Sequence, residues 1–179
     1  MVDPGATATE SRASASSKKE VIAIDCEMVW VSQDGKKRIL ARVSLVNKSG
    51  DCIYDKFVKP TKKVVDYRTP WSGIRPADIE NGEDFRVVQH EVAEYLRGRV
   101  LVGHSLKHDL RALFLDHPMH DQFDTALHPP FLAGFGDKTP SLKYLAEQFL
   151  GLNVQEGEHS SIEDARAAMK LHNIAMGES

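Results

Sequence analysis

The sequence predicts an α/β domain with a mixed β-sheet and helices on both faces of that sheet. Three runs rich in apolar and β-branched residues come first, separated by turn sequences, and short apolar runs then alternate with segments of helical periodicity. This order is typical of a sheet that combines an antiparallel three-strand meander with parallel strands.

The meander is expected over residues 21–31, 38–47 and 52–58. An Asp-Gly dipeptide at 34–35 and a Lys-Ser-Gly turn at 48–50 separate these runs. Strands joined by such short connections pair antiparallel, so the three runs are predicted to be neighbours in the sheet.

The middle of the chain is predicted to alternate between helices and short strands. Proline and glycine residues make 59–84 mostly loop with short helical turns. Periodicity then predicts a helix over 87–96, a buried strand over 100–102, a helix over 106–115 and a strand near Phe123.

Two further helices are expected near the C-terminus. The first follows Ser141, a residue that favours N-caps, and ends at Gly151. The second begins at Ser160, and Glu163 stands three residues later, which is the spacing of a capping box. The apolar faces are Leu142, Leu145 and Phe149 in the first helix, and Ile162, Ala165, Met169 and Met176 in the second.

Composition indicates one globular domain in a chain of 179 residues. Residues 1–19 are small and polar and are predicted to form a disordered tail, with the domain over 20–176. No apolar run approaches the roughly 18 residues of a membrane span, so no membrane association is expected. Cys26 and Cys52 are too few for a disulfide framework, which favours a reducing, intracellular compartment.

An acidic pair stands in the first predicted strand, after the apolar run 21–24. Side chains alternate along a strand, so Asp25 and Glu27 point to one face and Cys26 to the other. Two neighbouring carboxylates repel each other, and a hard divalent cation such as Mg²⁺ removes that cost. Asp78 and Glu80 have the same spacing but lie in a polar, loop-like stretch.

Three further residues are candidates from their positions. Asp109 follows the apolar strand that ends in a glycine, where functional side chains often lie, although pairing with Lys107 or Arg111 would also account for it. His159 precedes the last helix and Asp164 lies in its first turn, where an acid also favours the helix N-terminus electrostatically.

Other histidines leave alternatives open. The spacing from His159 to Asp164 recurs between His104 and Asp109, so spacing alone does not select one histidine. His104 and His108 are four residues apart, as in a helical zinc site, but the glutamate of that motif is missing and no cysteine pair lies nearby.

Four motifs in order carry a family resemblance. They are IDCEMVW at 24–30, YRTPWSGI at 67–74, LVGHSLKHDLRALFLDHP at 101–118 and EHSSIEDARAAMKL at 158–171. Together they resemble the histidine-containing acidic 3′-to-5′ exonuclease family, which includes the interferon-stimulated exonuclease. The match runs from about residue 20 to 172.

The resemblance implies a ribonuclease-H-like fold and two Mg²⁺ or Mn²⁺ ions. By position in the motifs, Asp25, Glu27, Asp109 and Asp164 hold the metals, and His159 rather than His104 is the general base. The implied reaction releases nucleoside 5′-monophosphates from a 3′ end. Two bound divalent ions would bring the formal net charge of −3 to +1, which suits a nucleic-acid substrate better than the metal-free charge does.

The resemblance also implies a substrate and its contacts. Segments that surround the terminal nucleotide in the family contain Met28, Arg68, Ser72 and Ile74 of this chain. Trp71 could form a wall or stacking surface of the pocket that accepts the strand end, or it could be a core residue. The expected partner is single-stranded nucleic acid, RNA favoured over DNA, bound by a monomer.

The implied biological setting is ribosomal RNA processing in the nucleus or nucleolus, with the cytoplasm also open. His108 stands where the family pattern leads us to expect asparagine. Two other functions compete with this interpretation: a DNA-directed repair exonuclease, and a catalytically silent nucleic-acid-binding scaffold.

Overall fold

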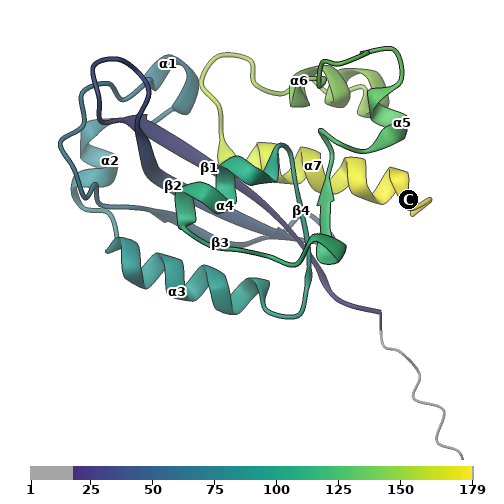
Figure 1. The fold of residues 1–179 in the computed structure, drawn as a ribbon, viewed down its shortest axis with the longest axis horizontal. Helices are drawn as coiled ribbons and strands as arrows, with labels where there is room; N and C mark the ends of the chain where they lie inside the picture. The colour runs from purple at the N-terminus through teal and green to yellow at the C-terminus, as the bar shows by residue number, and fades with distance from the viewer. Residues whose placement is uncertain (1–17, 179) are drawn as a thin grey trace, which may run out of the picture.

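The computed structural model describes residues 18–178, which form one five-stranded sheet with helices on both faces (Figure 1). The strand order is β3-β2-β1-β4-β5. The disordered tail predicted over 1–19 falls almost entirely outside the described residues. Within those residues, no helix is long and apolar enough to cross a membrane.

The sheet is mixed, as the sequence predicts. β1 pairs antiparallel with β2 and parallel with β4; β2 also pairs antiparallel with β3, and β4 parallel with β5. The strands are β1 (Val21–Trp30), β2 (Arg38–Asn47), β3 (Cys52–Phe57), β4 (Val100–Gly103) and β5 (Gln122–Asp124).

Helices α3 and α4 cover one face of the sheet, and α7 covers the other (Figure 1). The longer helices are α3 (Phe85–Leu96), α4 (Leu106–Leu113) and α7 (Ser161–Ala175). The shorter ones are α1 (Thr69–Ser72), α2 (Pro76–Glu80), α5 (Pro129–Leu132) and α6 (Leu142–Leu145), with a 3-10 turn η1 (Met119–Asp121) and a π-helical turn η2 (Ala146–Leu150).

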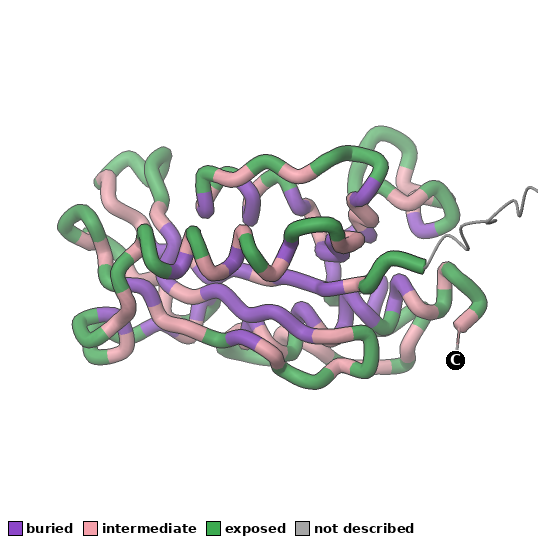
Figure 2. The backbone as a smooth tube through the Cα atoms, turned by 90° about the horizontal axis from the view of Figure 1, so that it is seen from below, coloured by how far each residue is buried: buried purple, intermediate pink, exposed green. Residues whose placement is uncertain are grey.

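Alternation along β1 divides the core into two layers. Ile22, Ile24 and Cys26 pack with α3 and α4, whereas Ala23 packs with α7. Figure 2 shows the buried residues concentrated along the central strands and the exposed ones at the loops. Each fully buried aliphatic side chain contributes roughly 1.5–3 kcal/mol, so this sheet is a rigid support for polar groups placed on it. Both cysteines, Cys26 and Cys52, are free thiols.

Local chemistry moves some boundaries from those predicted. α3 begins at Phe85 because the Asp84 carboxylate accepts hydrogen bonds from Arg86 N and Val87 N. α4 ends at Leu113, two residues earlier than predicted, because Phe114 adopts a left-handed φ of 51°.

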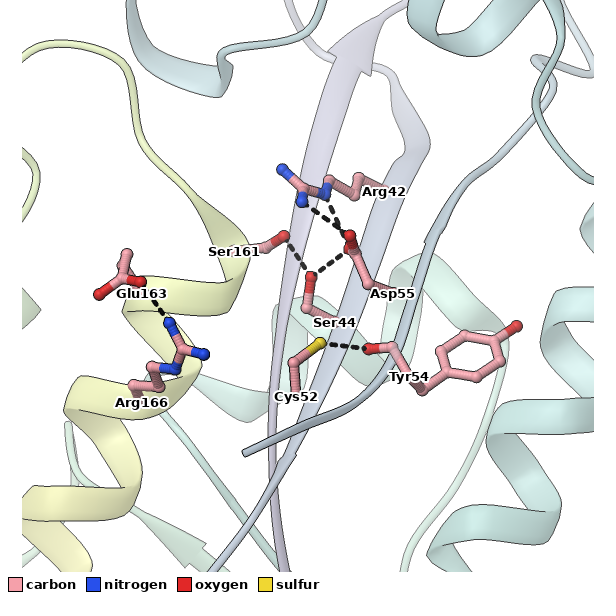
Figure 3. Close-up of polar contacts among 8 residues, drawn as sticks. All are labelled: Arg42, Ser44, Cys52, Tyr54, Asp55, Ser161, Glu163 and Arg166. Atoms are coloured by element: carbon pink, nitrogen blue, oxygen red, sulfur yellow. Dashed lines mark hydrogen bonds and ion pairs between the residues drawn. The ribbon is translucent and has the colours of Figure 1, made fainter. Parts of the chain in front are cut away.

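The predicted capping box at the start of α7 is wrong. Ser160 is the N-cap, but its side chain accepts no capping hydrogen bond. Glu163 instead receives a 2.6 Å hydrogen bond from Arg166 Nη1 (Figure 3). The predicted apolar faces also extend too far, since Phe149 and Met176 are 42% and 48% exposed.

Candidate active site

Three carboxylates from two elements converge on the α7 side of the sheet. Asp25 and Glu27 come from β1 and Asp164 comes from the first turn of α7. One oxygen from each lies within 4.8 Å of the others. Within residues 18–178 this is the one group of three or more histidine, cysteine or acidic side chains close enough to share a metal ion.

Burial, together with neighbouring charges, makes the three carboxylates harder to ionise. Burial, followed by the charges of Asp109, Asp164 and Glu27, raises the pKa of Asp25 well above its usual range. Burial and then Asp164 raise the pKa of Glu27 to about 8, although Arg42 opposes that shift. Burial also raises the pKa of Asp164. Burial is the first cause in all three, because it disfavours the charged form of a carboxyl group.

Two oxygens of the cluster have no hydrogen-bond partner. Glu27 Oε1 and Asp164 Oδ1 are both buried and accept no hydrogen bond from any residue between 18 and 178. A buried acceptor without a partner costs roughly 1–3 kcal/mol. Carboxylate oxygens gathered in this way fit Mg²⁺ or Mn²⁺, which prefer oxygen ligands.

Asp109 reaches the same region from α4 but stays outside the 4.8 Å group. Its side chain is buried, and burial raises its pKa to about 7, against a hydrogen bond from the Cys26 thiol that lowers it. Asp124, at the end of β5, accepts hydrogen bonds from Ser105 N (2.7 Å) and Leu106 N (3.0 Å). This carboxylate supplies the N-terminal cap of α4 and so fixes the helix that carries Asp109.

The approach of strand to helix is also constrained at Gly103. A Cβ there would lie 2.4 Å from Leu106 Cδ2 and 3.2 Å from Ile24 O, so any larger residue would force the buried Leu106 side chain to shift. Glycine at this position thus lets Leu106, the first residue of the helix that carries Asp109, pack directly against the end of β4.

A polar network anchors α7 to the sheet (Figure 3). Ser161 Oγ and Ser44 Oγ lie 2.6 Å apart, and Ser44 also donates to Asp55 Oδ1 at 2.7 Å. Arg42 forms two 2.8 Å hydrogen bonds to the Asp55 carboxylate. In the β1–β2 register Ser44 is opposite Asp25 and Arg42 is opposite Glu27. The network therefore lies directly beside the acidic pair.

The register of β1 and β2 shifts immediately after that pair. Glu27 is opposite Arg42, but Met28 is opposite Leu40, so Ala41 is the extra residue of a bulge in β2. Bulges increase local twist and redirect side chains. The bulge thus lies in β2 beside Glu27, while the alternation along β1 continues, with Met28 packed on the α3 and α4 side.

His159 lies at the edge of the cluster. Its Nδ1 is 3.9 Å from Asp164 Oδ2, and its side chain is 27% exposed. Its backbone N donates to Trp71 O at 2.7 Å, and a Cβ on Gly73 would lie 2.9 Å from His159 O. The loop that carries His159 is thus held against α1, and glycine at position 73, with φ of 66°, permits the close approach.

Two more contacts fix the same loop. Arg75 pairs with both oxygens of Glu158, at 2.6 and 3.0 Å. Gln155, at a left-handed φ of 58°, donates to Asp164 Oδ2 at 2.7 Å. Sequence reasoning missed Gln155, because its partner is defined only once the loop folds back on α7.

A pocket of about 290 Å³ opens beside Glu27. Of the predicted nucleotide-binding residues, Met28, Arg68 and Ser72 line it, together with Trp71 and His159. Arg68 places its guanidinium 4.0 Å from the centre of the Trp71 ring. The remaining lining residues are Cys26, Trp30 and Arg38.

Ser72 and Ile74 are positioned as structural residues. Ser72 donates to Tyr67 O at 2.7 Å and accepts from Ile74 N at 3.0 Å, which closes the turn after α1. Ile74 is 1% exposed, packs with Val29 and Ile79, and does not line the pocket. Its contact with a nucleotide stays a prediction.

The competing histidines have other partners. His104 Nδ1 is 2.9 Å from Thr125 Oγ1, and His108 Nδ1 is 3.0 Å from Arg38 Nη2. Burial, followed by Arg38, lowers the pKa of His108. Asp78, from the second acidic pair, caps α2 by accepting from Arg75 N. These contacts give each residue a role without a metal.

Comparisons with known proteins show which proteins this chain resembles. The family model described as Exonuclease, of the RNase T type, matches residues 22–172. RNA exonuclease 4 of Xenopus laevis is 56% identical over 153 residues, covering 86% of this chain and 36% of the relative. RNA exonuclease 4 of Saccharomyces cerevisiae is 48% identical over 167 residues, covering 91% and 58%. The chain thus spans little more than a third of the frog relative, and the family resemblance predicted from the four sequence motifs is confirmed.

Solved structures agree on the fold. The Saccharomyces cerevisiae Pan2 pseudoubiquitin hydrolase–RNA exonuclease module in complex with AAGGAA RNA is 31% identical, with a TM-score of 0.80 over 93% of this chain and 30% of that one. The Neurospora crassa Pan2 catalytic unit is 29% identical, with a TM-score of 0.77 over 88% and 28%. The predicted ribonuclease-H-like fold is therefore confirmed.

Proposed function

Because the chain belongs to the exonuclease family of the RNase T type, we propose that it removes nucleotides from the 3′ end of single-stranded RNA in a reaction that needs divalent metal ions. The observation that carries this proposal is the trio Asp25, Glu27 and Asp164, with two unpartnered buried oxygens beside a nucleotide-sized pocket. RNA as substrate is supported by the names of the relatives and by the RNA in the Pan2 structures.

Two Mg²⁺ or Mn²⁺ ions are the proposed cofactors, held by Asp25, Glu27, Asp164 and Asp109. When bound, such ions activate water and neutralise the charge that develops on the phosphate and on the leaving oxygen. Burial is the main cause of the raised pKa values of the acids, and bound cations would offset what burial costs the charged forms, which supports this assignment.

His159 is the proposed general base. It is partly exposed and adjoins Asp164, so its imidazole can meet both solvent and a phosphate placed at the cluster. Hydrogen bonding through Trp71 O and the Arg75–Glu158 pair holds its loop in place while the ring stays free of any hydrogen bond within residues 18–178. Base catalysis of this kind contributes typically ~10²–10⁴ in rate.

The pocket is the proposed site of the terminal nucleotide. The Arg68–Trp71 pair offers a flat cationic and aromatic surface for a base or sugar. Met28 and Arg68 are the candidates for contact with the ribose, where a 2′-hydroxyl distinguishes RNA from DNA. A narrow pocket accepts an unpaired end more readily than a duplex.

The test is cleavage of 5′-labelled RNA and DNA oligonucleotides by the purified chain in Mg²⁺, Mn²⁺ or EDTA. Stepwise shortening of RNA that yields nucleoside 5′-monophosphates, and stops in EDTA, is expected. A circular strand should resist, since it has no end. Faster cleavage of DNA would support the repair-exonuclease alternative, and binding without cleavage would support the silent scaffold.

Processing of ribosomal RNA in the nucleus or nucleolus by a monomer is part of the proposal, and it rests on the resemblance to RNA exonuclease 4. Depletion of the protein should cause 3′-extended ribosomal RNA precursors to accumulate. Unchanged precursor lengths would contradict a role in ribosomal RNA processing but would leave the proposed exonuclease reaction unaffected.

A further inference from the structure

A second and larger depression adjoins the candidate pocket on the α3 and α4 side of the sheet. Its volume is about 680 Å³, and we call it the basic groove. The β1–β2 turn, the segment after β3 and the outer side of α4 form its walls. Among the described residues that line it, six are lysine or arginine and none is acidic. They are Lys36, Lys37, Arg38, Lys59, Lys62 and Arg111.

The positive charge of the basic groove is mostly uncompensated. Lys36 pairs with Asp34 at 3.7 Å, but Lys37, Lys59, Lys62 and Arg111 form no ion pair with any residue between 18 and 178. The chain as a whole carries a formal charge of −3, so this surface has the opposite sign to the net charge of the protein. Such a surface attracts an anionic polymer.

An exposed aromatic side chain lines the same groove. Phe114 is 79% exposed and ends α4 at a φ of 51°, a conformation that is uncommon for bulky residues and usual for glycine at a helix C-terminus. Its ring meets Phe85 edge-on, with centroids 5.9 Å apart. This contact supports the ring while most of its surface stays open to stack against another planar group.

The basic groove is continuous with the candidate pocket. Met28, Trp30 and Arg38 line both. Arg38 is held at this junction by its hydrogen bond to His108 Nδ1 on α4. A strand with its end in the pocket therefore finds cations and an aromatic surface immediately beyond that end.

We propose that the basic groove binds the nucleotides that precede the terminal one in a single strand. Lys37, Lys59, Lys62 and Arg111 contact phosphates, and Phe114 stacks on a base. Phosphates explain the absence of acids among the lining residues, and unpaired bases explain the exposed ring, since stacking on aromatics is a feature of single-strand binding. This inference rests on the proposed function for the direction in which the strand runs.

The experiment measures binding by fluorescence anisotropy of labelled oligouridylates of two to ten nucleotides, in EDTA so that no strand is cut. The variants are Lys59→Ala with Lys62→Ala, and Phe114→Ala. Lys143→Ala with Lys170→Ala is the matched control, because these exposed lysines lie on α6 and α7 and do not line the groove. Thermal unfolding of each variant reports that it is folded.

Wild type should bind tighter as the strand lengthens beyond the pocket, and the control should behave in the same way. The double lysine variant should lose most of this length dependence, and its slope of log affinity against log salt should fall by about 0.7 for each lost phosphate contact. Phe114→Ala should weaken binding of long strands about ten-fold with little change in that slope.

Equal length dependence in wild type and both groove variants would overturn the proposal, as would equally tight binding of polyglutamate, which carries charge without bases. Cleavage of a dinucleotide by wild type in Mg²⁺ tests the proposed function independently of the groove, because a dinucleotide is too short to extend along it. Cleavage with no effect of the groove variants on binding rejects the groove alone. Loss of length dependence in the variants without any cleavage rejects the function alone.

Discussion

Ser44 Oγ and Ser161 Oγ lie 2.6 Å apart, and both residues are fully buried. Asp55 can only accept, so the Ser44 proton goes to Asp55 and Ser161 is the donor to Ser44. This bond joins the residue opposite Asp25 in β2 to the first residue of α7, three positions before Asp164. One hydrogen bond thus ties together the two elements that supply the acidic trio.

Ser161→Ala should loosen that junction. The change removes the donor to a buried hydroxyl, which costs roughly 1–3 kcal/mol of unfolding free energy. It should also weaken Mn²⁺ binding, because Asp164 is then held less firmly. Denaturant unfolding in EDTA and calorimetric Mn²⁺ titration provide the measurements. Ser49→Ala, in an exposed turn, is the control, and equal effects of the two changes would contradict the anchoring role.

The metal-free protein should lose stability as pH rises. The pKa of Glu27 is about 8 in the folded protein, against about 4.3 in an unfolded chain. The folded state therefore binds more protons between these values, and the unfolding free energy falls across this window. In EDTA the melting temperature should decrease from pH 5 to pH 8.

Two comparisons check this assignment. Glu27→Gln should make the decrease smaller, with Asp25 and Asp109 keeping part of it, whereas Glu147→Gln, at an exposed acid of η2, should leave it unchanged. Adding Mn²⁺ should raise the melting temperature more at pH 8 than at pH 5. A melting temperature that rises over this range in EDTA, with the same slope in Glu27→Gln, would show that the carboxylates are not the source.

Breaking the Arg75–Glu158 pair should affect turnover more than stability. The pair is exposed, so its loss changes unfolding little, but it holds the residue next to His159. Arg75→Ala should lower kcat with nearly unchanged melting temperature. The exchanged double variant Arg75→Glu with Glu158→Arg should recover much of the lost rate. No recovery, or no loss of rate in the single variant, would argue against a positioning role.

Arg68→Ala should reduce cleavage of RNA more than cleavage of DNA of the same sequence. Arg68 lies over Trp71 in the pocket and is a candidate for contact near the terminal ribose. Rates of single-turnover cleavage on both substrates give the ratio. If the rates of RNA and DNA cleavage fall equally, Arg68 contributes to the pocket but does not distinguish ribose from deoxyribose.

Sequence periodicity was sufficient to predict those features of the fold and the site that depend on neighbouring residues in the chain. Alternation along residues 21–31 places Asp25 and Glu27 on one face, and the structure has them there, because strand geometry leaves no other choice. The five-stranded mixed sheet also followed from the order of apolar runs.

Long-range partners could not be predicted in the same way. Gln155 and Ser44 reach the site only through the folded chain, 9 and 117 residues from Asp164 and Ser161 respectively. Glu163 has the spacing for a capping box, yet it pairs with Arg166 one turn along α7. Spacing alone did not distinguish His159 from His104, and the family resemblance was needed to choose His159. In the structure His159 lies beside Asp164, whereas His104 lies within hydrogen-bonding distance of Thr125.

The most direct test of the central claim is Mn²⁺ titration by calorimetry, with single-turnover RNA cleavage of the same samples, for wild type, Asp164→Asn and His159→Ala. If carboxylates hold the metal and His159 acts as a base, Asp164→Asn should lose both affinity and cleavage, because a carboxylate of the cage is gone. His159→Ala should keep metal affinity close to wild type while cleavage falls by roughly 10² or more. Equal loss of metal affinity in both variants, or undiminished metal binding and cleavage in Asp164→Asn, would contradict the account.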